Sequence, residues 1–156
     1  MKNTILILVM LIVSNLTHGQ NNYDKISEFG QYNGDWALIE SNGLLGFIDR
    51  EGNEVVKPKY DKISEFGQYN GDWALVESNG LLGFIDREGN EVVKPKYDKI
   101  SEFGQYTGDW ALVESNGLLG FIDREGNEVV KPKYDKIQNE GKLQGETEGK
   151  IEIIKN

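Results

Sequence analysis

The side chains that could do chemistry in this chain are carboxylates and aromatic rings, because the sequence has no cysteine and a single histidine, His18. That histidine lies in the N-terminal segment, which has the pattern of a signal peptide. The remainder can therefore build neither a Ser-His-Asp nor a Cys-His nucleophile, and the usual zinc, copper and haem sites are excluded. The glycines are dispersed one per turn, so no phosphate loop is present. We expect no catalytic residue, no metal site and no cofactor.

Carboxylates are abundant, and a repeating unit of 37 residues contains seven of them in each full copy. A carboxylate-based hydrolase needs two carboxyl groups that different surroundings hold in different protonation states. Near-identical copies give equivalent carboxyl groups equivalent surroundings, so we predict that the protein is not an enzyme and rank a hydrolase third among the functions considered. The stretch from Asp49 to Glu54 has the oxygen ligands of a calcium loop. It does not match the length and terminal glutamate of an EF-hand, so we interpret it as a polar turn.

Aromatic side chains recur at the same interval and are the best candidates for contact with a ligand. Stacked at equal spacing, they could form a ladder for a sugar or an extended peptide; alternatively, they fill the core between copies, where large rings contribute most. We favour the core for Trp36 and Phe47 and leave both roles open for Tyr32, which lies in a glycine-rich loop. The candidate binding residues are Tyr32, Tyr69, Tyr106, Trp36, Trp73 and Trp110.

A tandem repeat must position these residues. The string YDKI recurs every 37 residues and opens three full copies, residues 23–59, 60–96 and 97–133. The copies differ from the first only at Val76, Val113 and Thr107. A shortened fourth copy, residues 134–156, lacks the segment EVVKPK. We expect its polar residues to form a hairpin that caps the array, with Ile153 in the place of Phe121.

Within one copy the signals are those of β-strands. Residues 35–41 and 44–49 suit two strands, and Asn42-Gly43 between them is a strong hairpin turn signal. We predict a third strand at residues 54–57, ended by Pro58, and a fourth at residues 60–63. No window has a helical period. The sequence therefore predicts an all-β fold of tandem β-hairpin repeats in an open twisted array or solenoid. The alternative is a propeller-like arrangement, which needs four or more complete blades.

The run GLLGFIDREGNEVVKPKYDKI, which begins at Gly43, resembles the WG repeat (also called KWG), a module common in bacterial proteins. The tryptophan that names this family would stand just before Gly46, where this chain has Leu45, and before the equivalent glycines it has Leu82 and Leu119. The resemblance implies an all-β array that serves as an interaction module, and it implies no catalytic residues. It is carried by Gly46, Phe47, Ile48, Asp49, Gly52, Val55, Val56, Pro58, Tyr60 and Asp61.

Residues 1–19 have the pattern of a signal peptide cleaved before Gln20. Lys2 provides a positive start, and Ile5 to Val13 is an unbroken apolar run. A membrane anchor is the alternative, but a helix of that length rises only about 14 Å, roughly half of a bilayer core. We therefore expect residues 20–156 to form the mature β-repeat domain, with no membrane span after cleavage. We expect this domain to be secreted, periplasmic or on the cell surface.

The net charge of −9 argues against nucleic acid and anionic membrane surfaces as partners. We therefore expect a secreted, non-catalytic repeat module that binds a protein or a glycan at the cell surface. The alternative is a structural or spacer protein without a discrete ligand. Because interchangeable copies can pair out of register, we expect a monomer or weak self-association.

Overall fold

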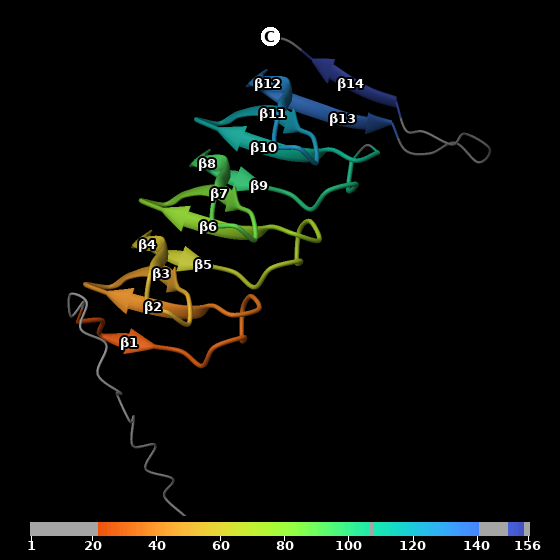
Figure 1. Ribbon diagram of the computed structural model, residues 1–156. Coiled ribbons are helices and arrows are strands. Elements are labelled where there is room, and N and C mark those ends of the chain that lie inside the picture. The colour runs from red at the N-terminus through yellow and green to blue at the C-terminus, as the bar shows by residue number, and fades with distance from the viewer. Residues whose placement is uncertain (1–21, 107, 141–149, 155–156) are drawn as a thin grey trace, which may run out of the picture.

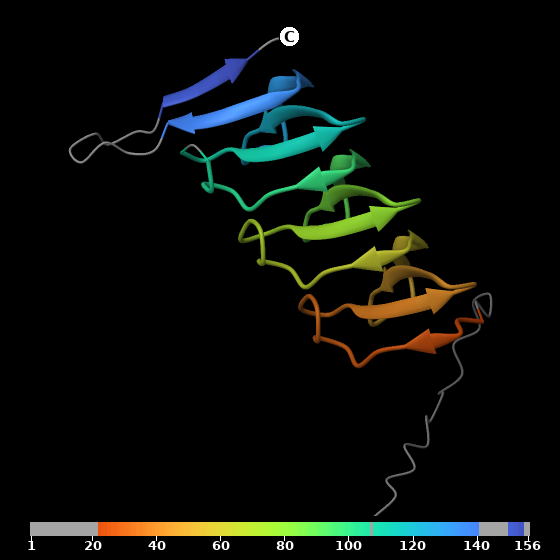
Figure 2. The same ribbon diagram turned by 180° about the vertical axis from the view of Figure 1, so that it is seen from behind.

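All the regular structure is β-strand in the computed structural model, which describes residues 22–106, 108–140 and 150–154. The expected signal peptide and Thr107 lie outside these ranges. The strands form three four-stranded antiparallel sheets and one two-stranded sheet, which lie one above another (Figures 1 and 2). The predicted all-β open array is confirmed, and none of these sheets closes into a barrel. No helix in the described ranges is both long and apolar enough to cross a bilayer.

Each full repeat supplies four strands in the same order. The first sheet consists of β1 (Lys25–Ile26), β2 (Ala37–Ser41), β3 (Leu44–Ile48) and β4 (Glu54–Tyr60). The second consists of β5 (Lys62–Ile63), β6 (Ala74–Ser78), β7 (Leu81–Ile85) and β8 (Glu91–Tyr97). The third consists of β9 (Lys99–Ile100), β10 (Ala111–Ser115), β11 (Leu118–Ile122) and β12 (Glu128–Tyr134). The two-stranded sheet consists of β13 (Lys136–Glu140) and β14 (Lys150–Ile154).

The predicted turn at Asn42-Gly43, which joins β2 to β3, is confirmed. Asn42 has a φ of 53° and Gly43 a φ of 77°, so both central residues adopt the left-handed conformation that this hairpin turn requires. The carboxylate of Asp24 accepts a hydrogen bond from the backbone N–H of Asn42 at 2.7 Å. The turn therefore fixes the register of β2 and β3 and is itself held against the start of the repeat.

The prediction that Pro58 ends the strand beginning at residue 54 is wrong, because β4 continues to Tyr60. The register with β3 shifts here, because Leu45 pairs with Tyr60 whereas Phe47 pairs with Val56. The extra residues form a bulge on an edge strand, where the missing N–H of a proline is tolerated. Gly46 permits the bulge, since a Cβ at this position would lie 2.3 Å from the carbonyl oxygen of Val56.

The predicted single strand at residues 60–63 is also wrong, because this segment divides between two sheets. Tyr60 pairs with Leu45 in the first sheet, whereas Lys62 pairs with Glu77 in the second. The chain crosses between the sheets at Asp61, whose backbone N–H donates to the carbonyl oxygen of Glu77 at 2.8 Å. The YDKI string is therefore the covalent joint of the array.

The fourth copy forms a hairpin, but with a different correspondence from the one we predicted. Ile137 of β13 pairs with Ile153 of β14, just as Ile100 of β9 pairs with Val113 of β10. Ile153 therefore takes the place of Val113, and its predicted correspondence with Phe121 is wrong. The physical reason is that β13 is five residues long, against two for β9, and pairs along its whole length with the strand that returns to it.

The hydrophobic core lies between successive sheets. Residues directly opposite in β2 and β3 share a face, so each sheet has an N-terminal face, which contains Ala37, Ile39 and Ile48, and a C-terminal face, which contains Phe47. The C-terminal face of one sheet packs against the N-terminal face of the next. The first of these clusters contains Phe47, Val56, Tyr60, Ala74, Val76 and Ile85, and the second contains Trp73, Phe84, Val93, Tyr97, Ala111, Val113 and Ile122.

Successive sheets are staggered as well as stacked. Strand β5 lies against β3, and β6 lies against β4. Each sheet is therefore displaced by about two strands from the one before it and covers the β3–β4 half of the C-terminal face. The other half of that face, over β1 and β2, is less covered: Lys25 is exposed, and Leu38 is only partly buried at the edge of the cluster.

Candidate functional site: a surface depression in each repeat

The stagger leaves one shallow depression in the same place on each full repeat. Its volume is about 220 Å³ in the first and second repeats and about 200 Å³ in the third. The first is lined by Lys25, Ile26, Ser27, Leu38, Ile39, Glu40 and Leu45. The second is lined by Lys62, Ile63, Ser64, Leu75, Val76, Glu77 and Leu82. The third is lined by Lys99, Ile100, Ser101, Tyr106, Leu112, Glu114 and Leu119.

Two leucines form the apolar floor of the first depression. Leu38 and Leu45 lie on the C-terminal face of β2 and β3, and both are only partly buried. The hydroxyl oxygen of Ser27 accepts a hydrogen bond from the backbone N–H of Leu38 at 2.9 Å, which holds the end of β1 against β2. The strands thus present two aliphatic side chains to solvent in a fixed geometry.

An ion pair forms the polar rim of each depression. Lys25 Nζ lies 2.8 Å from Glu40 Oε2, and the equivalent lysine and glutamate of the next two repeats are 2.8 and 2.9 Å apart. The hydrogen bond to Glu40 raises the pKa of Lys25. The lysine side chain is 74% exposed, so this pair adds little stability and is open to a ligand. A depression of this kind can take an apolar side chain or the flat face of a sugar, with polar groups meeting the ion pair.

The predicted tryptophans lie between the sheets. The ring centroid of Trp36 is 5.4 Å from that of Phe47 and 6.3 Å from that of Phe66 in the next repeat. Trp73 has equivalent neighbours and is only 7% exposed. Trp110 lies beside Phe121, with centroids 5.9 Å apart. This placement accords with the core interpretation.

The predicted tyrosines lie at the margin of the same ring clusters. The ring of Tyr32 is 5.8 Å from Phe47, and that of Tyr69 is 5.6 Å from Phe84. All three tyrosines are partly exposed, and Tyr106 lines the third depression. A binding role for the six aromatic residues stays a prediction, and the structure brings one of them to the site described above.

Sequence reasoning missed the leucines. Leu45, Leu82 and Leu119 each stand directly before the glycine that lies opposite the bulge. The repeat that this chain resembles has its tryptophan at the position of these leucines. The available signal was that all three copies have leucine at the position of the tryptophan. In the structure this leucine lines the depression of each repeat.

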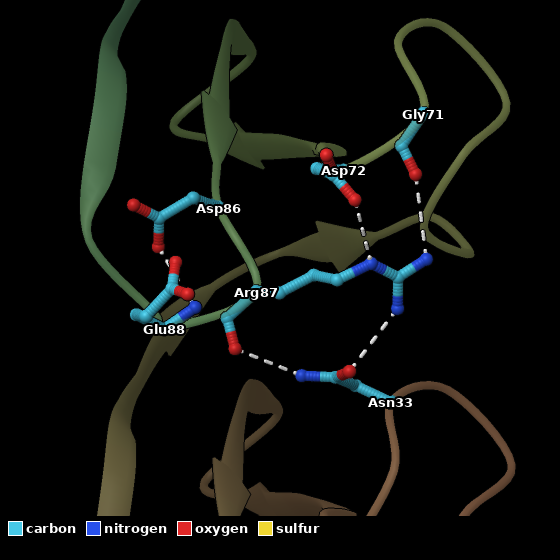
Figure 3. A network of polar contacts seen from close by, with 6 residues as sticks. All are labelled: Asn33, Gly71, Asp72, Asp86, Arg87 and Glu88. Atoms are coloured by element: carbon cyan, nitrogen blue, oxygen red, sulfur yellow. Dashed lines mark hydrogen bonds and ion pairs between the residues drawn. The ribbon is translucent and has the colours of Figure 1, made fainter.

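A second feature that sequence reasoning missed is a polar network between repeats (Figure 3). The guanidinium of Arg87 donates to Asn33 Oδ1 at 3.1 Å, and Asn33 Nδ2 donates back to the carbonyl oxygen of Arg87 at 2.9 Å. Arg87 also pairs with Asp72 at 3.2 Å and lies over the ring of Phe66. These contacts hold the loop before β2 against the next repeat. Asn70 makes one of the same contacts with the carbonyl oxygen of Arg124, at 3.2 Å.

Replacing Asn33 by alanine is therefore expected to lower the free energy of unfolding by about 1–2 kcal/mol, because two hydrogen bonds are lost and one of them is to a charged group. Chemical denaturation measures the change. Gln31→Ala in the same loop is the matched control, since Gln31 is exposed. Equal stability of the two variants would contradict the inter-repeat role of Asn33.

A tyrosine–glutamate pair also joins the first sheet to the second and the second to the third. Tyr60 donates its hydroxyl to Glu91 Oε1 at 3.0 Å, and Lys59 Nζ lies 2.8 Å from the same oxygen. Burial, aided by the neighbouring carboxylate, raises the pKa of Tyr60, and the hydrogen bond from Lys59 lowers the pKa of Glu91. The same arrangement joins Tyr97 and Lys96 to Glu128.

The raised pKa values of Tyr60 and Tyr97 predict that the protein loses stability at alkaline pH. Their pKa is higher in the folded than in the unfolded protein, so their contribution is fully present below about pH 10 and is lost as pH rises above it. The double variant Tyr60→Phe/Tyr97→Phe should have a flatter stability profile between pH 9 and pH 11, and each single variant should be intermediate. Thermal unfolding measured across this range checks the prediction, and parallel profiles for wild type and double variant would refute it.

The polar stretch that begins at Asp49 is a turn, as interpreted. The carboxylate of Asp49 accepts hydrogen bonds from the backbone N–H of Asn53 at 2.8 Å and from its Nδ2 at 2.9 Å. The hydrogen bond from the Asn53 side chain is the main reason that the pKa of Asp49 is lowered. Within the described ranges, no three residues of the types that ligate metals are grouped so as to hold an ion.

A comparison with known repeat families matches the part of each repeat that contains the glycine opposite the bulge and the YDKI string. The model of the WG containing repeat matches residues 46–81, 83–118 and 120–141, which together make up more than half of the chain. The chain belongs to the WG repeat family. Each matched WG repeat begins within the third strand of one sheet and runs through the joint into the next sheet, so the sequence unit ties two sheets together. No curated protein and no solved structure matches the chain.

Proposed function

We propose that this WG-repeat chain is a secreted, non-catalytic module that binds a protein or another cell-surface component through its depressions. The observation that supports this most directly is their recurrence: the same leucines and the same ion pair are open to solvent at the same place in all three repeats. Secretion rests on the signal-peptide pattern of residues 1–19.

Three equal sites on one array support multivalent binding. Each depression is small and shallow, so a single contact would be weak. Because stacking fixes the distance between sites, a target with a matching repeat can occupy them together and gain avidity without any stronger contact. We therefore expect the target itself to be repetitive, such as a repeat protein or a glycan chain.

A spacer without a discrete ligand is the second candidate. It is favoured by the open architecture, which gains one sheet with each added repeat (Figure 1). A carboxylate-based hydrolase remains a distant third, because the equivalent carboxylates of successive repeats have equivalent partners.

The leucines at the family's tryptophan position give the sharpest test. A triple variant with Leu45, Leu82 and Leu119 changed to threonine keeps β-propensity but removes the apolar floor. We expect it to fold and to retain its extracellular target at least about tenfold less well, because an apolar contact is lost at each of three linked sites. The measurement is affinity capture from the native extracellular medium, identification by mass spectrometry, and titration with the purified target.

The matched control changes Leu44, Leu81 and Leu118 to threonine. These leucines precede the first set directly in sequence and lie on the opposite face of the same strands. The control should capture the target as the wild type does. If both triple variants fold and capture the same set of proteins as the wild type, the depressions are not the binding site, and the spacer becomes the better proposal.

A further inference from the structure

The C-terminal end of the array contains a second surface, different from the depressions. In the two internal interfaces, a lysine and a tyrosine at the end of one sheet bind a glutamate from the next: Lys59 and Tyr60 bind Glu91, and Lys96 and Tyr97 bind Glu128. Lys133 and Tyr134 hold the equivalent positions at the end of β12, with Lys133 Nζ 5.2 Å from the centroid of the tyrosine ring. In the described part of the chain, no carboxylate reaches either of them.

The apolar residues beside this pair are also less covered than their counterparts. Val92 and Val93 lie under the turn of the following sheet, where a Cβ on Gly126 would be 2.9 Å from Val93 Cγ2. Their equivalents Val129 and Val130 are more open, and Val129 is 43% exposed. Tyr134 is likewise partly exposed, whereas Tyr60 and Tyr97 are each 1% exposed.

The two-stranded last sheet accounts for this opening. Strand β14 takes the place that β10 has in the third sheet, and β10 pairs with a strand on each side. In the described ranges β14 pairs only with β13, so its other edge has free backbone donors and acceptors. Figure 1 shows this hairpin at the upper end of the array, and β13 contacts β11. Among the described residues, this sheet has no counterpart of the hairpin formed by β11 and β12.

We propose that the C-terminal end of the array binds an acidic β-hairpin of a partner protein. The first strand of that hairpin adds to the free edge of β14. Its glycine turn covers Val129 and Val130, and a glutamate after the turn accepts hydrogen bonds from Lys133 and Tyr134. This is the chemistry that β7 and β8 already supply to the end of the first sheet, so the internal interface serves as the template for the partner.

A second copy of this chain is the less suitable occupant. Its first sheet does present a hairpin of the right type, in β3 and β4, followed by Glu54. However, that hairpin is continuous with β2, which pairs along its full length with β3 and would compete with β14 for the same position. A separate hairpin, with no strand before it, meets no such obstacle.

A peptide with the sequence of residues 81–97, cyclised because an isolated hairpin is marginal in water, is the probe. Fluorescence anisotropy should show saturable binding of this peptide to the full-length protein. Tyr134→Phe and Lys133→Met in the protein, and Glu91→Gln in the peptide, should each weaken binding about tenfold, as expected for loss of a hydrogen bond to a charged group. Lys59→Met, which removes the equivalent lysine inside the array, is the matched control and should leave binding unchanged.

Three outcomes would overturn the proposal. They are no saturable binding of the peptide, equal binding by wild type and the two C-terminal variants, or self-association of the full chain in sedimentation that Tyr134→Phe abolishes, which would make a second copy the occupant. The triple leucine variant should bind the peptide normally. Because this variant alters only the depressions, peptide binding by it tests the C-terminal surface independently of the proposed function.

Discussion

Replacing Gly83 by alanine is expected to lower the free energy of unfolding by about 3 kcal/mol or more. A Cβ at this position would lie 2.3 Å from the carbonyl oxygen of Val93 and 2.6 Å from the nitrogen of Pro95. Both atoms belong to the backbone of the bulge in β8, so neither can move aside without changing the register of β7 and β8. Equilibrium denaturation with guanidinium chloride measures the effect.

Gly71→Ala is the matched control for this substitution. Gly71 is exposed, it is not among the glycines with positive φ, and a Cβ there would meet no atom within 4 Å. The change should be neutral or slightly stabilising, because alanine reduces the entropy of the unfolded chain. If Gly83→Ala is tolerated as well as Gly71→Ala, the close approach at the bulge is not what this glycine provides.

Phe84→Ala is expected to cost about 3–5 kcal/mol, the usual range for removing a fully buried ring. Phe84 is fully buried, and its ring centroid lies 5.3 Å from Trp73 and 6.2 Å from Phe103 of the following repeat. The substitution therefore opens a cavity in the interface between the second and third sheets. Denaturation followed by tryptophan fluorescence measures both the stability and the surroundings of Trp73.

A phenylalanine at the N-terminal end of the array is the control for this prediction. Phe29 corresponds to Phe66 and Phe103, but it is 39% exposed because no sheet of the array precedes it in the described ranges. Phe29→Ala should cost less than about 1 kcal/mol. Comparable losses for Phe84→Ala and Phe29→Ala would show that the inter-sheet clusters are not the main source of stability.

The sequence determines the local turns and the stacking principle well. Asn42-Gly43 is a hairpin turn because few residue pairs tolerate two positive φ angles, and the exact period places equivalent rings in equivalent positions. The assignment of Trp36 and Phe47 to the space between copies follows from their size. These inferences depend on residue chemistry and on short spacings, which a single sequence shows directly.

The joints between sheets could not be predicted in the same way. Pro58 suggests a strand end, and only the pairing of Gly46 with the bulge shows how the strand continues past it. The split of Tyr60 and Lys62 between two sheets depends on which strand each residue pairs with, and local propensity does not specify this. The contact between Asn33 and Arg87 joins residues 54 positions apart and has no local signature.

The candidate site could not be predicted from the sequence for a related reason. Leu38 and Leu45 have the pattern of buried strand residues, and in a sheet fully covered by its neighbour both would be core. The stagger of the sheets is what leaves them accessible, and the stagger depends on the length of the joint and on packing between repeats. The position of Leu45, where the family has tryptophan, was the only local indication.

The claim on which all of this depends is that each sheet is stable because it rests on its neighbours. Urea unfolding of a variant that lacks residues 60–96, compared with the full chain, tests it most directly. Coupled sheets predict a single transition with a lower midpoint and a smaller dependence on urea, because one interface has been removed. A midpoint equal to that of the full chain would mean that each sheet folds independently, and would contradict the account.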